Sequence, residues 1–590
     1  MKQFFKFMFA SMAGYLLLSI IMFVIFIAMV ASMAALTKSK PVTIKENSVI
    51  TLKLDKPIPD RTSNNPFGDF DFGSMKPQKS QGLDNLSKML KTAAADDNIK
   101  GILLDMTDIP SGIATIEEVR IMLQEFKKSG KFIVSYGDYY TQRAYYLASV
   151  ADKIFLNPEG ELMFKGLAAE LMFFKGTLEK LDVQAQIIRH GKFKSAVEPF
   201  ILDKMSAANR EQYQKMLDVL WQQMVDGIAA QRKLTVEELN QIADSLKIQT
   251  AADAVKYKLA DSLFYRDELH SYIRTKLGLN ENDKISFITG PKYFKGMKSK
   301  DKLAIGKKKI AVVYAIGSIG TGEGDEKNIG SDCLSQAIRD VRTDSAIKAM
   351  VLRINSPGGS ALASEVIWRE VVLTQKVKPV VVSMGDVAAS GGYYIACGAG
   401  KIYAQPNTLT GSIGVFGVVP NMENFFKNKL GITFDVVKTN EYSDYITTSR
   451  SLKPYETKVL TNQIENIYKV FVGHVAEGRK MKPEDVDTIG QGRVWSGVDA
   501  KRIGLVDELG SLEDAIKEAA KLAKMEDYKL VSYPKFKDPF TQILEEMFGE
   551  NSEVKVKEVL GENYIYYEYL KNLQKQKGVQ ARLPFDIIIY

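Results

Sequence analysis

The stretch Gly385-Asp-Val-Ala-Ala-Ser390-Gly-Gly-Tyr-Tyr394 joins a short β-branched run to a segment that can continue as a helix. The preceding run, residues 379–384, is typical of a strand in a sheet that is covered on both faces. Ser390 should therefore lie at the start of a helix, where the first amides have no partner within the helix and suit a developing oxyanion. A serine cap beside tightly packed glycines would leave the same pattern.

The composition indicates a large globular protein. With 590 residues the chain is too long for one core, and roughly two to four domains are expected. The net charge of +8 is spread along the chain and partly gathered in 292–309, which favours a solvated linker over a site for nucleic acid. Cys333 and Cys397 form no disulfide framework and lack metal-ligand spacing, so stability should not depend on disulfide bridges. We expect no metal or other cofactor.

Residues 7–36 contain no charged side chain and are flanked by lysines on both sides. This run exceeds the roughly 20 residues that span a bilayer and the about 7–15 residues of a signal-peptide core. An uncleaved membrane anchor is therefore predicted, rather than a signal that is removed. Because so few residues precede it, we expect the N-terminus to stay inside and the rest of the chain to be exported.

The sequence contains an internal repeat. Segments 99–105, 131–138 and 252–254 return as 347–353, 379–386 and 498–500. The offsets are nearly constant, since 386 minus 138 is 248 and 500 minus 254 is 246. A constant offset over so many segments indicates two copies of one domain.

Each copy alternates short apolar strands with helical stretches. In the second copy we expect strands at 348–355, 379–384, 401–405 and 413–419, and helices at 361–376 and from 391. A strand is also expected at 42–54, a loop at 57–82, and a long amphipathic helix late in each copy. This alternation predicts an α/β fold with mostly parallel strands. The expected domains are an anchor at 1–40, a first repeat domain at 41–290, a basic linker at 291–308, a second repeat domain at 309–535 and a tail at 536–590, whose end (586–590) could add an edge strand.

The two copies differ at the positions that carry chemistry. Gln142 stands opposite Ser390, because 390 minus 248 is 142, so the first copy cannot supply this nucleophile. About fifty residues further on, Lys194 of the first copy stands opposite Ser443 of the second. These two differences between the copies predict a shared site at their junction. Independent drift at two unrelated surface positions would leave the same differences.

A serine nucleophile needs a base to accept its proton. His190, Lys192 and Lys194 are the candidates, whereas His270 and His474 lie on predicted helices. A lysine that is neutral at pH 7 costs roughly 4.6 kcal/mol from an ordinary pKa near 10.4, and burial can supply a shift of about 3–5 units. Apolar residues around Lys194 are suited to form such a pocket, but Lys192 would point to the same side in an extended chain, so periodicity does not choose between the two lysines. The apolar residues are Phe193, Ala196, Val197 and Phe200.

Several motifs together carry a family resemblance. They are Val387-Ala-Ala-Ser-Gly-Gly-Tyr-Tyr394, Lys194-Ser-Ala-Val-Glu-Pro-Phe200, Asn355-Ser-Pro-Gly-Gly-Ser360 and Thr410-Gly-Ser-Ile-Gly-Val415. The chain resembles the signal peptide peptidase A (protease IV) family in its long, duplicated form. That resemblance implies a tandem Clp protease and crotonase-like superhelix of ββα units, and a homotetrameric bowl on the outer, periplasmic face of the bacterial inner membrane. It also implies cleavage of remnant signal peptides and pairs Ser390 with Lys194, in preference to Lys192 and His190.

The remaining motifs then receive roles. We expect the backbone amides of Gly359 and Gly391 to form the oxyanion hole, with Gly358 as an alternative to Gly359. Ser412 is expected to orient Lys194, unless it is a plain turn serine. The predicted reaction acylates Ser390 with Lys194 as base, and water activated by the same amine then hydrolyses the ester. Small or apolar substrate side chains are expected.

Two other functions fit the pattern less well. A crotonase-like acyl-CoA enzyme would share the fold, but it would need a carboxylate acid/base and no membrane tether. A non-catalytic membrane scaffold would use the duplicated core only for assembly. A serine-directed fluorophosphonate probe separates both from a protease, because neither predicts labelling of Ser390.

Overall fold

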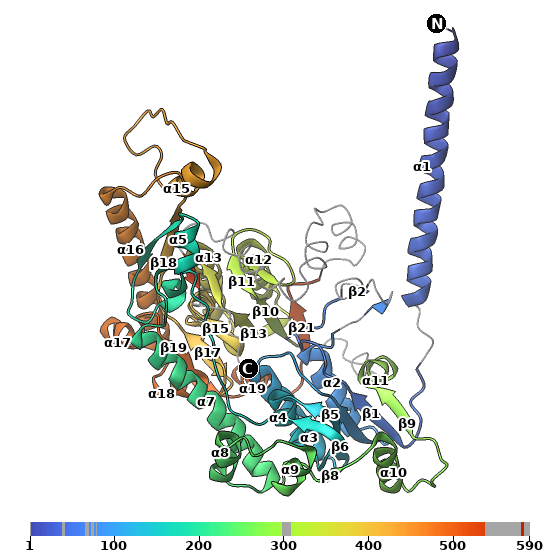
Figure 1. Cartoon of the computed structure of the whole chain (residues 1–590). Coiled ribbons are helices and arrows are strands. Elements are labelled where there is room, and N and C mark those ends of the chain that lie inside the picture. The colour runs from blue at the N-terminus through green and yellow to red at the C-terminus, as the bar shows by residue number, and fades with distance from the viewer. Residues whose placement is uncertain are drawn as a thin grey trace.

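The computed structural model describes residues 2–37, 42–64, 70–71, 76–77, 80–297, 308–536 and 580–582. Helix α1 (Lys2–Thr37) stands apart from the body of the molecule (Figure 1). Its segment Gln3–Met22 has a mean hydropathy of 1.8 and is not buried, so it is long and apolar enough to cross a membrane. The apolar N-terminal helix expected from the sequence is therefore present.

The first half of the body is a parallel sheet of six strands in the order β8-β6-β5-β4-β1-β9. Helices α2, α3, α4 and α7 pack on one face, and α10 covers the other through Leu269 and Ile273. Its strands are β1 Ser48–Leu52, β4 Ile99–Asp105, β5 Phe132–Tyr140, β6 Lys153–Leu162, β8 Ser262–Leu263 and β9 Ser286–Thr289. Its helices are α2 Leu83–Ala94, α3 Ile113–Lys127, α4 Gln142–Ala148, α5 Lys175–Lys180, α6 Glu198–Ile201, α7 Ala207–Arg232, α8 Val236–Asp244, α9 Ala251–Lys256, α10 Arg266–Leu277 and α11 Gly290–Gly296.

The second half repeats this plan with a sheet in the order β19-β17-β15-β13-β10-β21, and β16 and β20 extend it beside β15. All of its pairs are parallel except β17 with β19. Helix α19 covers one face, and α12, α13, α14 and α16 cover the other. Its strands are β10 Lys309–Ile316, β13 Ile347–Ser356, β15 Val380–Ala389, β16 Lys401–Ala404, β17 Leu409–Gly411, β19 Val494–Ser496, β20 Glu508–Leu509 and β21 Lys529–Tyr533. Its helices are α12 Ser331–Thr343, α13 Ala361–Gln375, α14 Gly391–Ala396, α15 Glu423–Phe425, α16 Pro454–Arg479, α17 Pro483–Ile489, α18 Gly497–Arg502 and α19 Leu512–Leu522.

Two pairs of corresponding helices have equal lengths. Helices α3 and α13 have 15 residues each and begin 248 positions apart, since 361 minus 113 is 248. Helices α7 and α16 have 26 residues each and begin 247 positions apart, since 454 minus 207 is 247. The prediction of two tandem α/β copies with mostly parallel strands is therefore confirmed.

Strand β15 differs from its expected length in a way that matters for the site. It continues past Met384 to Ala389, because residues 387–389 pair in parallel with β17. Ala388 and Ala389 thus extend the ladder, although alanine is not a typical strand residue. The expected strand at 42–54 is shorter, as β1 covers only Ser48–Leu52.

A third sheet joins the two halves. Its order is β12-β11-β14-β22-β18-β7, and its strands are β7 Gln184–Arg189, β11 Ser318–Gly320, β12 Asn328–Gly330, β14 Gly358–Ser360, β18 Phe416–Asn421 and β22 Gln580–Arg582. Strand β7 of the first copy pairs antiparallel with β18 of the second. A short hairpin, β2 (Phe70–Asp71) with β3 (Lys76–Pro77), forms a separate sheet.

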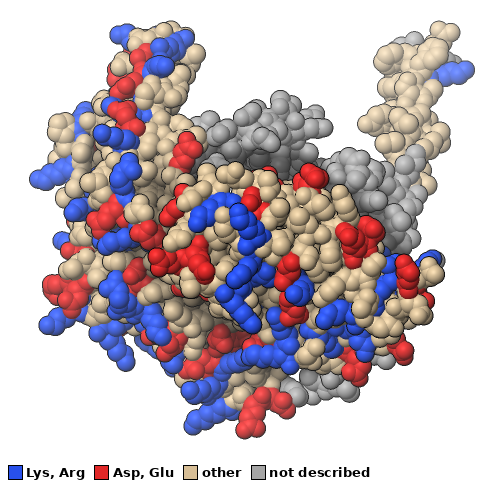
Figure 2. Space-filling view, turned by 60° about the horizontal axis from the view of Figure 1, so that its bottom comes forward, with Lys and Arg blue, Asp and Glu red and all other residues tan. Residues whose placement is uncertain are grey.

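The boundary predictions involve segments that are only partly described. Helix α11 overlaps the start of the expected linker at 291–308, and residues 298–307 lie outside the described residues. The expected tail at 536–590 is described only at 536 and in β22, so the edge strand expected at 586–590 also lies outside them. The domain limits stay a prediction. Over the face in Figure 2, Lys and Arg side chains are interspersed with Asp and Glu.

A buried ionic cluster ties the halves together. Arg353 of β13 donates through Nε to Asp60 Oδ1 at 2.6 Å, and its Nη1 lies 2.6 Å from Glu118 Oε1 of α3. All three side chains are at most 2% exposed. Asp386 of β15 accepts from the Thr115 amide of α3 at 2.9 Å, which satisfies an amide in the first turn of that helix.

Replacing Arg353 with methionine should destabilise the fold by about 3–5 kcal/mol, because Asp60 and Glu118 would remain buried without their cation. The denaturation midpoint in urea measures this effect. Arg502→Met is the matched control, since the Arg502 side chain is 68% exposed, and it should change stability by less than about 1 kcal/mol. Equal midpoints for the two variants would contradict the prediction.

Candidate active site

Ser390 lies between β15 and α14 on a strained turn. Its φ of 55° and ψ of −115° fall in a region that residues other than glycine rarely adopt. The Ser390 amide donates to the Gly411 carbonyl at 2.8 Å, and the Tyr394 amide donates to the Ser390 carbonyl at 2.8 Å. The residue is completely buried. The hydroxyl is thus held by a backbone that is hydrogen-bonded on both sides.

Lys194 reaches this serine from the first copy. Strand β7 pairs with β18 and leads the following residues toward the second half. Lys194 Nζ lies 2.9 Å from Ser390 Oγ, 2.9 Å from Ser412 Oγ and 3.2 Å from the Ser412 carbonyl oxygen. The structure therefore brings together three residues that the sequence assigned to one site, although they come from different copies.

The environment of Lys194 is water-poor. The residue is completely buried, next to a cluster formed by Ala196, Val197 and Phe416. Burial lowers the pKa of the Lys194 amine well below its ordinary value of 10.5. The amine can therefore be neutral at a pH where an exposed lysine is charged, and a neutral amine can accept a proton.

The two alternative bases are placed differently. Lys192 is exposed, with Nζ 5.6 Å from the centroid of the Phe193 ring. His190 Nδ1 lies 2.8 Å from Glu465 Oε1, and its ring stacks on Tyr468 at a centroid distance of 3.7 Å. Of these three candidates, Lys194 is the one whose side chain is hydrogen-bonded to Ser390 in the described part of the chain.

The glycines beside Ser390 allow close backbone packing. A Cβ at Gly392 would lie 2.7 Å from the carbonyl oxygen of Ser356, and a Cβ at Gly359 would lie 2.0 Å from that of Ile319. Gly358, the alternative oxyanion residue, has a φ of 95° and donates its amide to Ser356 Oγ at 3.1 Å. Gly391, the first residue of α14, is buried beside Ser390. Tight packing thus explains part of the glycine pattern, as the simpler interpretation of the motif expected.

Two strands of the third sheet continue from the strands that pair with the C-terminal part of β15. Strand β13 leads directly into β14, and β17 leads through Ser412 into β18. Strand β22 fills the space between them and runs antiparallel to both. Its Ala581 is paired with Gly359, and its Gln580 is paired with Ser360 and with Phe416. The site thus accommodates an extended chain next to the candidate oxyanion glycine.

Residues 491–493 also belong to the site, and the sequence analysis missed them. The Phe193 amide donates to the Gln491 carbonyl at 2.8 Å, and the Ser412 amide donates to the Arg493 carbonyl at 2.7 Å. They carry no nucleophile, base or metal ligand that would draw notice. The available signal was the comparison of the two copies at this position.

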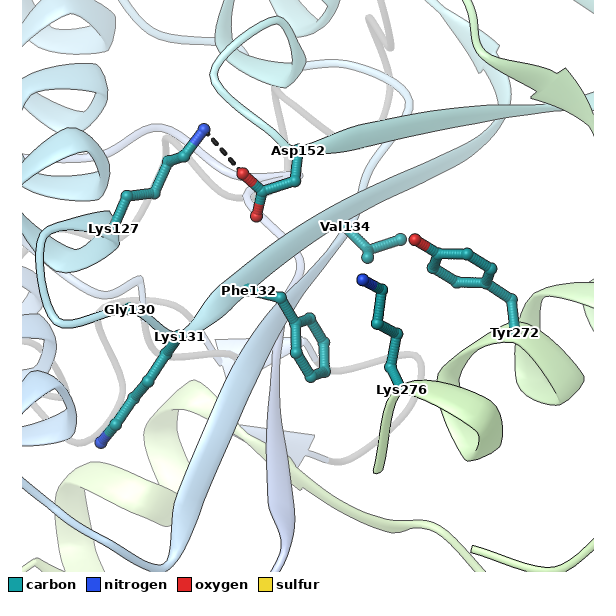
Figure 3. Close-up of a pocket in the computed structure, with 8 residues that line it drawn as sticks. All are labelled: Lys127, Gly130, Lys131, Phe132, Val134, Asp152, Tyr272 and Lys276. Atoms are coloured by element: carbon teal, nitrogen blue, oxygen red, sulfur yellow. Dashed lines mark ion pairs between the residues drawn. The ribbon is translucent and has the colours of Figure 1, made fainter. Parts of the chain in front are cut away.

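A cavity in the first half of the body is not part of the candidate active site. It has a volume of about 290 Å³ and lies where Lys127 and Asp152 form an ion pair at 2.8 Å (Figure 3). None of Ser390, Lys194 or Ser412 lines it. Within the described ranges, no group of three or more His, Cys, Asp and Glu side chains is arranged to hold a metal ion.

Comparison with known proteins gives matches over most of the chain. The family described as "Peptidase family S49" matches residues 125–280 and again 373–526, once in each copy. "Protease 4" of Salmonella typhi is 38% identical over 480 residues, which cover 80% of this chain and 77% of that protein. "Protease 4" of Haemophilus influenzae is 37% identical, over 73% of this chain and 72% of that protein.

A plant protein and a solved structure are also similar. "Serine protease SPPA, chloroplastic" of Arabidopsis thaliana is 32% identical over 92% of this chain and 78% of that protein. The solved structure of a ClpP1 point mutant from Listeria monocytogenes gives a TM-score of 0.24 at 17% identity, covering 35% of this chain and 94% of that one.

Proposed function

The chain belongs to peptidase family S49, and we propose that it is a serine endopeptidase in which Ser390 is the nucleophile and Lys194 the general base. The family resemblance inferred from the motifs is thereby confirmed. The observation that carries the proposal is the distance of 2.9 Å between a buried amine of one copy and a buried hydroxyl of the other. A nucleophile and a base within hydrogen-bond reach are what covalent catalysis requires.

In the proposed mechanism the neutral Lys194 amine removes the Ser390 proton as Oγ attacks the peptide carbonyl carbon. The amides of Gly359 and Gly391 stabilise the oxyanion of the tetrahedral intermediate. The protonated amine then gives its proton to the leaving nitrogen, and the C–N bond breaks to leave an ester on Ser390. Lys194 next activates a water that hydrolyses this ester. Ser412 orients the amine through its hydroxyl and carbonyl oxygens.

The proposed substrates are extended peptides, above all remnant signal peptides and other apolar segments. Strand β22 supports an extended mode of binding, because it lies antiparallel between β14 and β18, with Ala581 paired to Gly359. A peptide in that place would gain main-chain hydrogen bonds from two strands at once. The identity of the apolar substrates rests on the family resemblance.

We also propose that α1 is a single membrane anchor that keeps the body on the outer side of a bacterial cytoplasmic membrane. Its exposed, apolar segment Gln3–Met22 supports a membrane-spanning role. The proposed assembly is a homotetramer, by resemblance to the family. An anchor would hold the active site close to signal peptides that remain in the bilayer after cleavage.

A fluorophosphonate probe tests the proposal. The full chain in detergent should be labelled on Ser390, and the labelling rate should fall as the pH drops through the lowered pKa of Lys194. The sign follows from the amine, which is a base only above that pKa, so below it the rate should fall about tenfold per pH unit. Mass spectrometry of the labelled peptide identifies the site. Labelling of another residue, or no labelling at any pH, would contradict the proposed serine peptidase. The acyl-CoA enzyme or the non-catalytic scaffold would then be the remaining functions.

A further inference from the structure

We infer that the segment 491–493, with Gly492 at its centre, is a positioning element that seats Lys194 against Ser390. This inference rests on the proposed roles of those two residues. The segment lies between the lysine loop of the first copy and the Ser412 turn of the second. The Gln491 carbonyl accepts a hydrogen bond from the Phe193 amide, and the Arg493 carbonyl accepts one from the Ser412 amide. The Gly492 amide donates to the Ile413 carbonyl at 2.7 Å.

Gly492 is in direct contact with the backbone of the lysine. A Cβ at this position would lie 2.6 Å from Lys194 Cβ, 2.7 Å from its amide nitrogen and 2.8 Å from its Cα. Real Cβ atoms essentially never approach heavy atoms closer than 3.0 Å. Two of these atoms belong to the backbone and cannot rotate away. Any side chain at 492 must therefore displace Lys194 itself.

The first copy has a leucine at the position that corresponds to Gly492. With the offset of 246, Gly492 corresponds to Leu246, and the following helix caps Ser496 and Thr250 correspond as well. Leu246 also has a positive φ, 44° against 77° for Gly492, but its side chain is 57% exposed. A positive φ thus tolerates leucine where the side chain is exposed to solvent. The turn at Gly492 differs, since Gln491 also has a positive φ of 54° and the Arg493 amide donates to the Gly490 carbonyl at 2.9 Å. Contact with Lys194 adds a clash to the backbone strain that a side chain would have in this turn.

Two further glycines complete the close approach. A Cβ at Gly414 would lie 2.7 Å from Gly492 Cα and 3.3 Å from Lys194 Cδ. Gly191 has a φ of 101°, and a Cβ there would lie 2.5 Å from the carbonyl carbon and oxygen of Gln491. The backbone segments that contain Gly191, Gly414 and Gly492 therefore pack closely around Lys194.

The Arg493 side chain holds the segment 491–493 in place through three contacts. Its guanidinium carbon lies 4.6 Å from the ring centroids of both Phe193 and Trp495, and Nη2 lies 2.9 Å from Glu211 Oε1 on α7. The contact with Phe193 restrains the residue next to Lys194. The ion pair fixes the segment to the first copy, which supplies the lysine.

The test is the variant Gly492→Ala in the full chain, assayed with a fluorogenic apolar peptide over a range of pH. We expect kcat to fall by at least about 100-fold, since an ångström of misplacement has that effect on an oriented reaction. We expect KM to be unchanged. A displaced, better solvated amine should also move the acid limb of the rate profile to higher pH.

Gly504→Ala is the matched control. Gly504 has a φ of 81°, and an added Cβ there meets no heavy atom within 4 Å, so this variant carries the backbone strain without the clash. It should keep the wild-type kcat and pH profile. If Gly492→Ala fails to fold, Arg493→Met provides a milder displacement, with about a tenfold loss in kcat that Arg493→Lys partly restores.

The outcomes separate the inference from the proposed function. A wild-type kcat and pH profile in Gly492→Ala, or equal losses in Gly492→Ala and Gly504→Ala, would overturn the positioning role. In either case hydrolysis that still depends on Ser390 leaves the proposed function standing. Hydrolysis by Ser390→Ala at the wild-type rate would remove the proposed function itself.

Discussion

Replacing Ser390 with alanine should remove measurable peptide hydrolysis, a loss of at least about 10⁴-fold in kcat/KM. In the proposed mechanism the variant lacks the oxygen that forms the acyl-enzyme, and Lys194 then has no Ser390 proton to abstract. No catalytic route through the ester remains, although the oxyanion amides are still in place. Initial rates with a fluorogenic peptide, or the release of new termini from a synthetic signal peptide, measure the loss.

Ser443→Ala is the control for this variant, because Ser443 is the exposed serine that corresponds to Lys194 in the repeat. It should keep full activity. Since Ser390 and alanine differ by one oxygen, the fold and any oligomer should persist in Ser390→Ala. Turnover by Ser390→Ala at more than a trace level would mean that another group is the nucleophile.

Replacing Lys194 with methionine should lower kcat/KM by roughly 10³–10⁴-fold, within the range that a general base and its partners contribute. Methionine fills a similar space without an amine, so Ser390 loses its proton acceptor. Lys192→Met is the matched control, because Lys192 is exposed and two residues away, and it should keep the wild-type rate. Equal losses in the two variants would point to a general effect of positive charge near the site.

The same variant should have a different dependence of stability on pH. Burial lowers the pKa of Lys194 in the folded state, whereas the unfolded chain has a lysine with an ordinary pKa near 10.4. Below that pH the unfolded state binds a proton that the folded state releases, so this lysine destabilises the fold progressively as the pH falls toward its lowered pKa. Lys194→Met removes that penalty.

Denaturation midpoints at pH 7 and pH 10 test this consequence. The methionine variant should gain stability relative to wild type at pH 7, and the gain should shrink as the pH approaches 10. A gain that is the same at both pH values would come from packing alone. Loss of the hydrogen bonds to Ser390 and Ser412 lowers the midpoints at both pH values equally. The difference in stability gain between pH 7 and pH 10 therefore reports the protonation of the Lys194 amine.

Part of the site was predictable because it is encoded in local patterns. The β-branched run before Ser390 and the small residues after it predicted a strand, a turn and a helix, which the structure contains as β15, Ser390 and α14. The constant offset predicted two copies, and the differences between the copies predicted that Ser390 and Lys194 belong together. Local sequence did not predict the extension of β15, since Val387, Ala388 and Ala389 pair only because β17 lies beside them.

The sequence by itself determined the duplication, the α/β class, the apolar N-terminal helix and the candidate nucleophile, because each depends on periodicity or on the chemistry of one short segment. The comparison of the copies and the family resemblance favoured Lys194, but only the tertiary structure buries its amine at 2.9 Å from Ser390 Oγ, whereas Lys192 is exposed. The tertiary structure also decided that a side chain at residue 492 would clash with Lys194, whereas Leu246 at the corresponding position of the first copy is exposed. Desolvation and close approach are properties of surfaces that come together from distant parts of the chain, and no single segment contains them.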